Sequence, residues 1–98
     1  MSKTKELPIP PAVLEAEQAL EIARVWGADG EQHVTLAGEL WDDPAAWGLV
    51  LVDLARHVAN AYEQGSGREV NEVLERIREA FDAEWDSPTD QPTGTIET

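Results

Sequence analysis

The spacing of hydrophobic residues changes along the chain, and this change divides the chain into elements. In residues 31–37, polar and apolar side chains alternate and include the β-branched Val34 and Thr35, which is typical of a strand. In residues 70–85, apolar side chains recur every three or four positions, which predicts an amphipathic helix. The strand needs a partner strand, and the helix needs another element to cover its apolar face.

The partner strand is expected directly before the alternating segment. Asp29-Gly30 suits the two central positions of a tight hairpin turn, which require positive φ. With this turn, residues 20–26 pair with residues 31–37, and Val25 faces Val34. The sequence therefore predicts a β-hairpin.

The same register gives the hairpin two different faces. One face is apolar and includes Ala23 opposite Leu36. The other face carries these residues: Ile22, Arg24, Trp26, His33, Thr35 and Ala37. The alternative is a helix that continues from Ala12 to Trp26, giving a three-helix domain with one stray strand. We prefer the hairpin, because that stray strand would have no pairing partner.

A long helix is expected after the hairpin. Asp43 is a good N-cap and Pro44 fits the first helical position, and the helix should end at Gly65 after Gln64. Its apolar arc spans about 200° at 100° per residue, which is wider than a surface helix needs. We therefore place this helix centrally, in contact with both the hairpin and the next helix.

A second helix should follow after a short turn. Ser66 and Glu69 have the spacing of a capping box, with Ser66 as N-cap. The helix runs to about Trp85 and is stopped by Ser87-Pro88.

The predicted fold is α+β: a β-hairpin packed against two antiparallel helices, with a helical turn near residues 12–18. We divide the chain into an extended N-terminal tail (1–11), a single domain (12–87) and a disordered C-terminal tail (88–98). The expected core residues are Val25, Val34, Leu36, Trp47, Leu51, Leu54, Val58, Val70, Val73, Leu74, Ile77 and Phe81.

Two motifs resemble a family of small bacterial proteins of unknown function and about this length. They are Trp-Asp-Asp-Pro-Ala-Ala-Trp-Gly at 41–48 and Asp-Leu-Ala-Arg-His-Val at 53–58. The segments 7–11 and 81–85 are similar too, so the resemblance covers most of the chain. It implies a bacterial cytoplasmic protein, and it assigns no activity and no catalytic residue.

Composition narrows the function classes. Twenty acidic and seven basic residues give the 98-residue chain a net charge of −13. This charge repels phosphate and anionic lipid, so we expect neither nucleic-acid nor membrane binding. The longest apolar run, Ala45–Val52, is far shorter than the roughly 20 residues that cross a bilayer. With no such run and no signal-peptide pattern in residues 1–11, we expect a soluble cytoplasmic protein. The chain contains no cysteine, so we expect neither disulfides nor thiolate chemistry.

One polar cluster is predicted on the long helix. Asp53 and His57 are four residues apart, so their side chains can meet, and Arg56 and Asn60 flank them. Such a pair is a candidate for acid–base chemistry, but an ordinary solvated helix face explains it better. We expect the substitution His57→Ala to leave the fold intact.

Metal, cofactor and nucleophile signals are weak. His33 and His57, even with Asp42 or Asp53, fall short of a convincing zinc ligand set. The serines lie in no nucleophile motif, and the Gly-Ser-Gly at 65–67 lacks the lysine of a phosphate-binding loop. We therefore expect no metal, no cofactor and no catalytic residue.

The function favoured by the sequence is a non-enzymatic protein–protein interaction module that forms a homodimer. The expected binding residues are Ile22, Arg24, Trp26 and His33 on the hairpin, and Asp53, Arg56, His57 and Asn60 on the helix. A further protein partner would be basic. The alternatives are a small enzyme or ligand-binding domain that uses Arg24, His33, Asp53 and His57, and an acidic decoy of nucleic acid.

Overall fold

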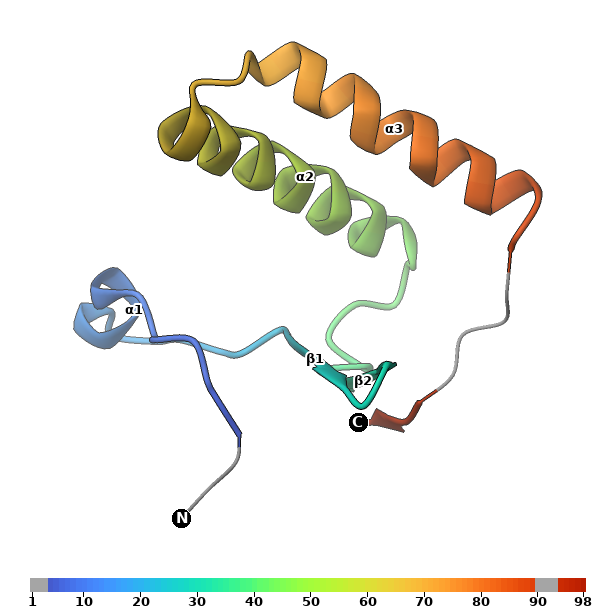
Figure 1. Cartoon of the computed structure of the whole chain (residues 1–98). Coiled ribbons are helices and arrows are strands. Elements are labelled where there is room, and N and C mark those ends of the chain that lie inside the picture. The colour runs from blue at the N-terminus through green and yellow to red at the C-terminus, as the bar shows by residue number, and fades with distance from the viewer. Residues whose placement is uncertain (1–3, 90–93) are drawn as a thin grey trace.

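The computed structural model describes residues 4–89 and 94–98. Its elements are α1 (Pro11–Glu15), β1 (Ala23–Ala28), β2 (Glu31–Leu36), α2 (Ala45–Ser66), α3 (Val70–Asp86) and β3 (Ile96–Glu97). The long helices α2 and α3 lie side by side and antiparallel, and the small sheet lies across from them (Figure 1). The predicted α+β class, with a hairpin and two long antiparallel helices, is confirmed.

The hairpin has the predicted turn and the predicted register. Asp29 and Gly30 both have positive φ, at 52° and 80°, which is the backbone of the tight turns that join twisted antiparallel strands. Val25 pairs with Val34, and Trp26 pairs with His33. The continuous helix considered for Ala12–Trp26 is therefore excluded, and only α1 is helical there.

The third strand was not predicted. The sequence suggests a disordered tail for residues 88–98, of which 90–93 lie outside the described residues. Ile96–Glu97 nevertheless pairs in parallel with β2, and the backbone N–H of Val34 donates to the carbonyl of Thr95 at 2.9 Å. A strand of two residues carries no periodicity, so hydrophobic spacing cannot reveal it. The predicted N-terminal tail likewise includes residues 1–3, which are not described.

Helix α2 begins one residue later than expected and also ends later than expected. Pro44 stands at the N-cap rather than at the first helical position, and the Asp43 carboxylate accepts a hydrogen bond from the N–H of Ala45, the first helical residue, at 2.9 Å. At the other end Gly65 is helical, and Gly67 adopts the left-handed conformation with φ of 71°. The helix ends there because a glycine meets no Cβ penalty at positive φ.

This later end corrects the predicted capping box. Ser66 is the last residue of α2, and its hydroxyl donates to the carbonyl of Tyr62. Glu69 caps α3 alone, because its carboxylate accepts from the N–H groups of Asn71 and Glu72, both at 3.0 Å. The predicted stop at Ser87-Pro88 is confirmed, since α3 ends at Asp86.

The two long helices touch through small side chains. Ala59 of α2 is completely buried, and Val73 of α3 is 4% exposed. Ala55 and Ala59 lie four residues apart on one face of α2, and small residues let helix axes approach closely. The tightest contact therefore lies toward the α2–α3 loop, where Arg68 also stacks over the ring of Tyr62 at 5.3 Å.

The expected closed core does not form in one chain. Val73 is buried, while Val34, Leu36, Trp47, Val70, Leu74 and Ile77 are half-buried and the other expected core residues are exposed. Within the described residues, the backbone of the sheet makes no close contact with that of α2 or α3. The sequence pattern identified the apolar faces correctly. The expected contact between α2 and the hairpin is absent from the described backbone, because the helix pair and the sheet form separate layers joined by residues 37–44.

The chain therefore exposes more surface than a compact protein of the same mass. Its accessible surface is 8953 Å², whereas a compact protein of this mass exposes about 5,500 Å². The Cα radius of gyration is 15.7 Å, against about 12.6 Å for a compact chain of this length. A large part of the apolar surface therefore remains in contact with solvent.

Gly94 should be essential for the attachment of β3. It has φ of 105°, and a Cβ at this position would overlap the carbonyl oxygen of Gln32. We expect Gly94→Ala to release β3 and to speed the amide exchange of Val34 by about tenfold or more, measured by NMR. Gly27→Ala is the matched control, because a Cβ at Gly27 meets no atom within 4 Å. Unchanged exchange of Val34 in the Gly94 variant would contradict this role.

The contact at Ala59 should control the stability of the helix pair. We expect Ala59→Leu to lower the free energy of unfolding by about 1–3 kcal/mol, because the added methylene groups have no space. Chemical denaturation at one fixed protein concentration measures this loss. Ala83→Leu, at an exposed position of α3, should change stability by less than about 0.5 kcal/mol. If Ala59→Leu and the unmodified chain had equal free energies of unfolding, α2 and α3 would tolerate a wider separation and the prediction would be wrong.

Candidate interaction surface

The predicted polar cluster lies on α2 and is fully exposed to solvent. The closest approach within it joins Arg56 and Asp53 at 3.9 Å, with both side chains mostly exposed. Among residues 4–89 and 94–98, Asp53 makes no hydrogen bond to His57. Asn60 is exposed one turn further along the helix. An exposed ion pair of this kind contributes little to stability and gives the imidazole no fixed partner.

The predicted hairpin residues lie together on one face of the sheet, as the register required. Arg24 is already engaged there, because its guanidinium donates two hydrogen bonds to Glu21 at 2.6 and 2.9 Å. This bidentate pair lowers the pKa of Glu21 and raises the pKa of Arg24. Arg24 is therefore part of an exposed ion pair on this face rather than a free cation.

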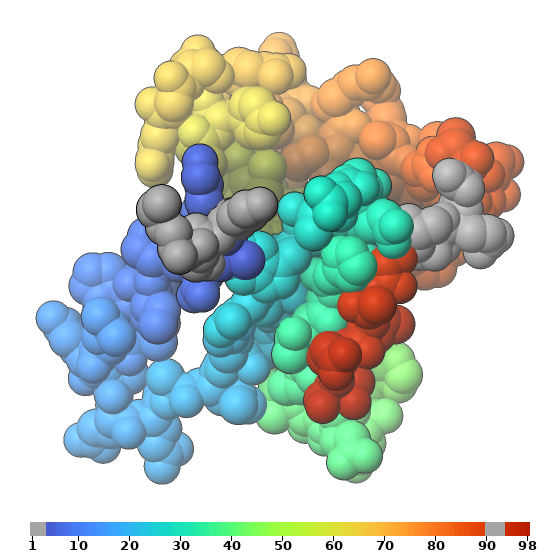
Figure 2. All heavy atoms as spheres, turned by 60° about the horizontal axis from the view of Figure 1, so that its bottom comes forward, coloured from blue at the N-terminus to red at the C-terminus, as the bar shows by residue number. Residues whose placement is uncertain are grey.

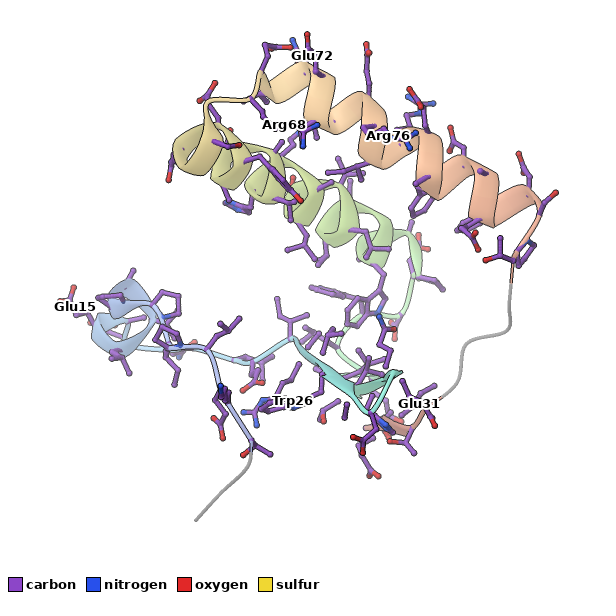
Figure 3. The ribbon with its side chains drawn as sticks, viewed as in Figure 1. Glu15, Trp26, Glu31, Arg68, Glu72 and Arg76 are labelled. Atoms are coloured by element: carbon purple, nitrogen blue, oxygen red, sulfur yellow. The ribbon has the colours of Figure 1, made fainter. Side chains whose placement is uncertain are left out.

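His33 has a structural partner from the end of the chain. Its Nδ1 accepts a hydrogen bond from the backbone N–H of Thr95 at 3.1 Å, and the Thr95 hydroxyl lies 2.9 Å from the same nitrogen. A ring nitrogen that accepts carries no proton, so the proton of a neutral His33 is on Nε2. Trp26, labelled in Figure 3, lies on the hairpin away from the two long helices. The half-buried Ile22 and Trp26 complete this face.

The predicted site residues thus form two separate groups, one on the hairpin and one on α2. Neither hydrogen bonds nor ion pairs within the described chain connect Arg24 and His33 to Asp53 and His57. Outside residues 1–3 and 90–93, no cluster of three or more acidic or histidine side chains has the arrangement of a metal site. The arrangement therefore gives no pocket in which these four residues converge.

An apolar groove lies between α2 and α3. It has a volume of about 780 Å³. Its main lining residues are Trp47, Leu51, Leu74, Ile77, Phe81 and Trp85. Phe81 and Trp85 stack with their ring centroids 5.5 Å apart, and Trp47 meets Trp41 edge-on at 5.3 Å. Aromatic rings therefore line the end of the groove that lies away from the α2–α3 loop.

The apolar surface continues from the groove along α2. Leu54 and Val58 stand next to Leu51 on the helix face and are exposed, Leu54 by 55%. We call the groove together with Leu54 and Val58 the helix-pair surface. The sequence assigned these side chains to the core, and the signal for an open surface was the 200° width of the apolar arc. Helix α3 covers the side of that arc that carries Ala55 and Ala59.

The lining of the groove is mainly apolar. Its only charged lining groups within the described residues are Arg56, Arg78 and Asp82, all at exposed positions. Arg78 donates to Asp82 at 3.4 Å. The remaining lining residues offer aliphatic and aromatic surface, which binds apolar side chains through burial of area.

In the described parts of the chain, no helix is long and apolar enough to cross a membrane.

Comparison with known proteins identifies the family. The model of a domain of unknown function, DUF5076, matches residues 6–89, so the chain belongs to this family. The resemblance to a small family of unknown function is thereby confirmed. A solved structure from the photosynthetic bacterium Rhodopseudomonas palustrus is 42% identical and matches with a TM-score of 0.71 over 95% of each chain. That protein carries the provisional name of a pyruvate dehydrogenase. No curated protein matches this chain.

His57 should be dispensable for the fold. Its side chain is exposed, so we expect His57→Ala to change the free energy of unfolding by less than about 0.5 kcal/mol in chemical denaturation. His33→Ala serves as the contrast, because it leaves the N–H of Thr95 without its acceptor and should weaken the attachment of β3. A large loss of stability in the His57 variant would mean that His57 is covered by another molecule.

Proposed function

We propose that this DUF5076 member is a non-enzymatic interaction module that acts as a homodimer through its helix-pair surface. The observation that carries this proposal is the exposure of large apolar side chains along α2 and α3. Contiguous apolar surface of this kind marks association sites, because monomeric proteins rarely leave it in water. The occupant to which we commit is a second copy of the same chain.

The surface area fits a second copy. Each chain exposes about 3,400 Å² more than a compact protein of its mass, out of its total of 8953 Å². Obligate homodimer interfaces bury about 2,000–5,000 Å² in total. The surplus of two chains is therefore large enough for such an interface.

Folding energetics support the same conclusion. Ordering the backbone costs about 1–2 kcal/mol per residue, and burial of apolar surface must offset this cost. Within the described residues, Ala59 and Val73 are the buried hydrophobic side chains. Association would add Leu51, Leu54 and Val58 to the buried set, which couples folding to dimer formation.

The helix-pair surface is better supported as the dimer contact than the hairpin face proposed from sequence. On the hairpin, Ile22, Trp26 and His33 are already half-buried in one chain, and Arg24 is paired with Glu21. We retain that face as a second proposed contact at the edge of the dimer. Asp53, His57 and Asn60 of the polar stripe would remain in solvent, and Arg56, which lines the groove, would lie at the edge of the contact.

Charge distinguishes this proposal from the acidic decoy. Two chains of net charge −13 repel each other, so salt that screens this repulsion should strengthen an apolar dimer. A decoy that binds a basic partner by charge would lose its binding steeply as salt rises. A bacterial cytoplasmic setting is part of the proposal and is supported by the bacterial origin of the solved relative.

A second candidate function is the binding of an apolar small molecule in the groove. Its volume of about 780 Å³ falls within the roughly 300–1,000 Å³ of small-molecule sites. The provisional name of the bacterial relative suggests an enzyme, but Arg24, His33, Asp53 and His57 do not converge. Ligand binding would give a monomer whose melting temperature rises with an apolar ligand.

Dimer formation should depend on Leu54. We expect the unmodified chain to sediment as a dimer at tens of micromolar and Leu54→Glu to sediment as a monomer, because a buried unpaired carboxylate is costly. The measurement is sedimentation equilibrium over a concentration series.

Leu49→Glu is the matched control for this prediction. Leu49 is 70% exposed on the same helix, but it lies one turn from Asp53 on the polar stripe and does not line the groove, so the variant should remain dimeric. A monomeric unmodified chain would contradict the proposal, and equal dissociation of both variants would contradict the assignment of the surface.

A further inference from the structure

The N-terminal arm, which we define as residues 7–20, contains helix α1. Helix α1 makes no close backbone contact with any other described element, and open space is visible between α1 and the hairpin (Figure 2). The arm nevertheless carries large apolar side chains. They are Leu7, Ile9, Val13, Leu14 and Leu20, all exposed, with Leu7 at 90% and Leu14 at 71%. The chain thus presents an uncovered apolar segment as well as an uncovered apolar groove.

The backbone of the arm is conformationally restricted by its prolines. Pro8, Pro10 and Pro11 fix the backbone φ angles and favour an extended approach to α1. This restriction lowers the conformational entropy that the arm loses on binding. Val13 and Leu14 follow in the single helical turn of α1, so the apolar side chains are concentrated in a short length.

Charge also favours the groove as the binding place of the arm. Residues 7–20 contain two glutamates, Glu15 and Glu17, and no basic residue, which gives a net charge of −2. The arginines of the groove, Arg56 and Arg78, pair with Asp53 and Asp82, so the groove is close to neutral in a chain of −13. An acidic apolar segment therefore meets less repulsion at the groove than at the acidic faces of the chain.

We propose that the arm of one copy occupies the α2–α3 groove of a second copy, and that the exchange is reciprocal. This inference rests on the homodimer proposed above and specifies its contacts. With Pro11–Glu15 helical and the other residues extended, residues 10–20 span roughly 28 Å, which approaches the chain's principal dimensions of 38 × 35 × 33 Å. The arm is thus long enough to cross to a neighbouring copy, and reciprocal exchange closes the dimer with two-fold symmetry.

Cross-linking between two different single-cysteine variants tests the exchange. The natural chain contains no cysteine, so Leu14→Cys labels the arm and Val52→Cys labels the groove without background. Val52 lines the groove and is half exposed, and its replacement by cysteine changes little volume. One variant carries a mass tag, the two are mixed and allowed to exchange, and a short bifunctional maleimide is added. The covalent heterodimer is then quantified on a denaturing gel.

The control replaces Val52→Cys by Leu49→Cys. Leu49 lies three residues earlier on α2 and is 70% exposed, but it does not line the groove. We expect roughly tenfold or more heterodimer with the groove cysteine than with the control, because docking raises the local concentration of the arm. The double variant Leu14→Cys/Val52→Cys, diluted into excess unmodified chain, reports any docking of the arm within its own chain.

Each result decides between the two proposals. Preferential cross-linking to position 52 between chains supports the exchange. Equal yields with the groove and control cysteines, from a chain that still sediments as a dimer, would overturn the exchange and leave the homodimer intact. Cross-linking within the diluted double variant would also overturn the exchange, because the arm would then fill its own groove. A monomeric chain would overturn both proposals.

Discussion

The contact between α2 and α3 determines what the rest of the molecule leaves exposed. It is made through the small side chains of α2, with Ala59 completely buried, and through Val73 of α3. Because α3 covers only this small-residue side of the apolar arc, Leu51, Leu54 and Val58 remain uncovered beside it. A helix with two apolar sides needs two neighbours, and one chain provides one of them. The open surface and the proposed dimer both follow from this geometry.

The hairpin could be predicted from the sequence because its determinants are local. Asp29-Gly30 requires a turn of positive φ, and period-two alternation in residues 31–36 fixes which side chains share a face. Helix boundaries were less certain, since Gly65 and Gly67 are both acceptable terminators. The choice between them depends on where the chain must turn to pack α3. Because α2 ends at Ser66, the N-cap of α3 is Glu69 rather than the predicted Ser66.

Other features depend on contacts that sequence spacing does not contain. The pairing of Ile96–Glu97 with β2 depends on a close approach at Gly94 and on the hydrogen bonds that Thr95 makes with Val34 and His33. The binding groove was missed for a related reason. Periodicity identifies an apolar face, but it does not say whether that face is covered by the same chain, and the expected core residues Phe81 and Leu51 instead line the groove.

The strong negative charge has a physical role in this arrangement. An uncovered apolar surface invites nonspecific association, and a net charge of −13 opposes it, because each approaching copy is repelled unless apolar burial is large. Glu72 of α3 points away from α2 (Figure 3), and Glu79 of the same helix is also exposed. Only an encounter that aligns the apolar faces gains enough burial to overcome the repulsion. In the proposed dimer, the acidic composition would therefore favour the one mode of association that aligns the apolar faces.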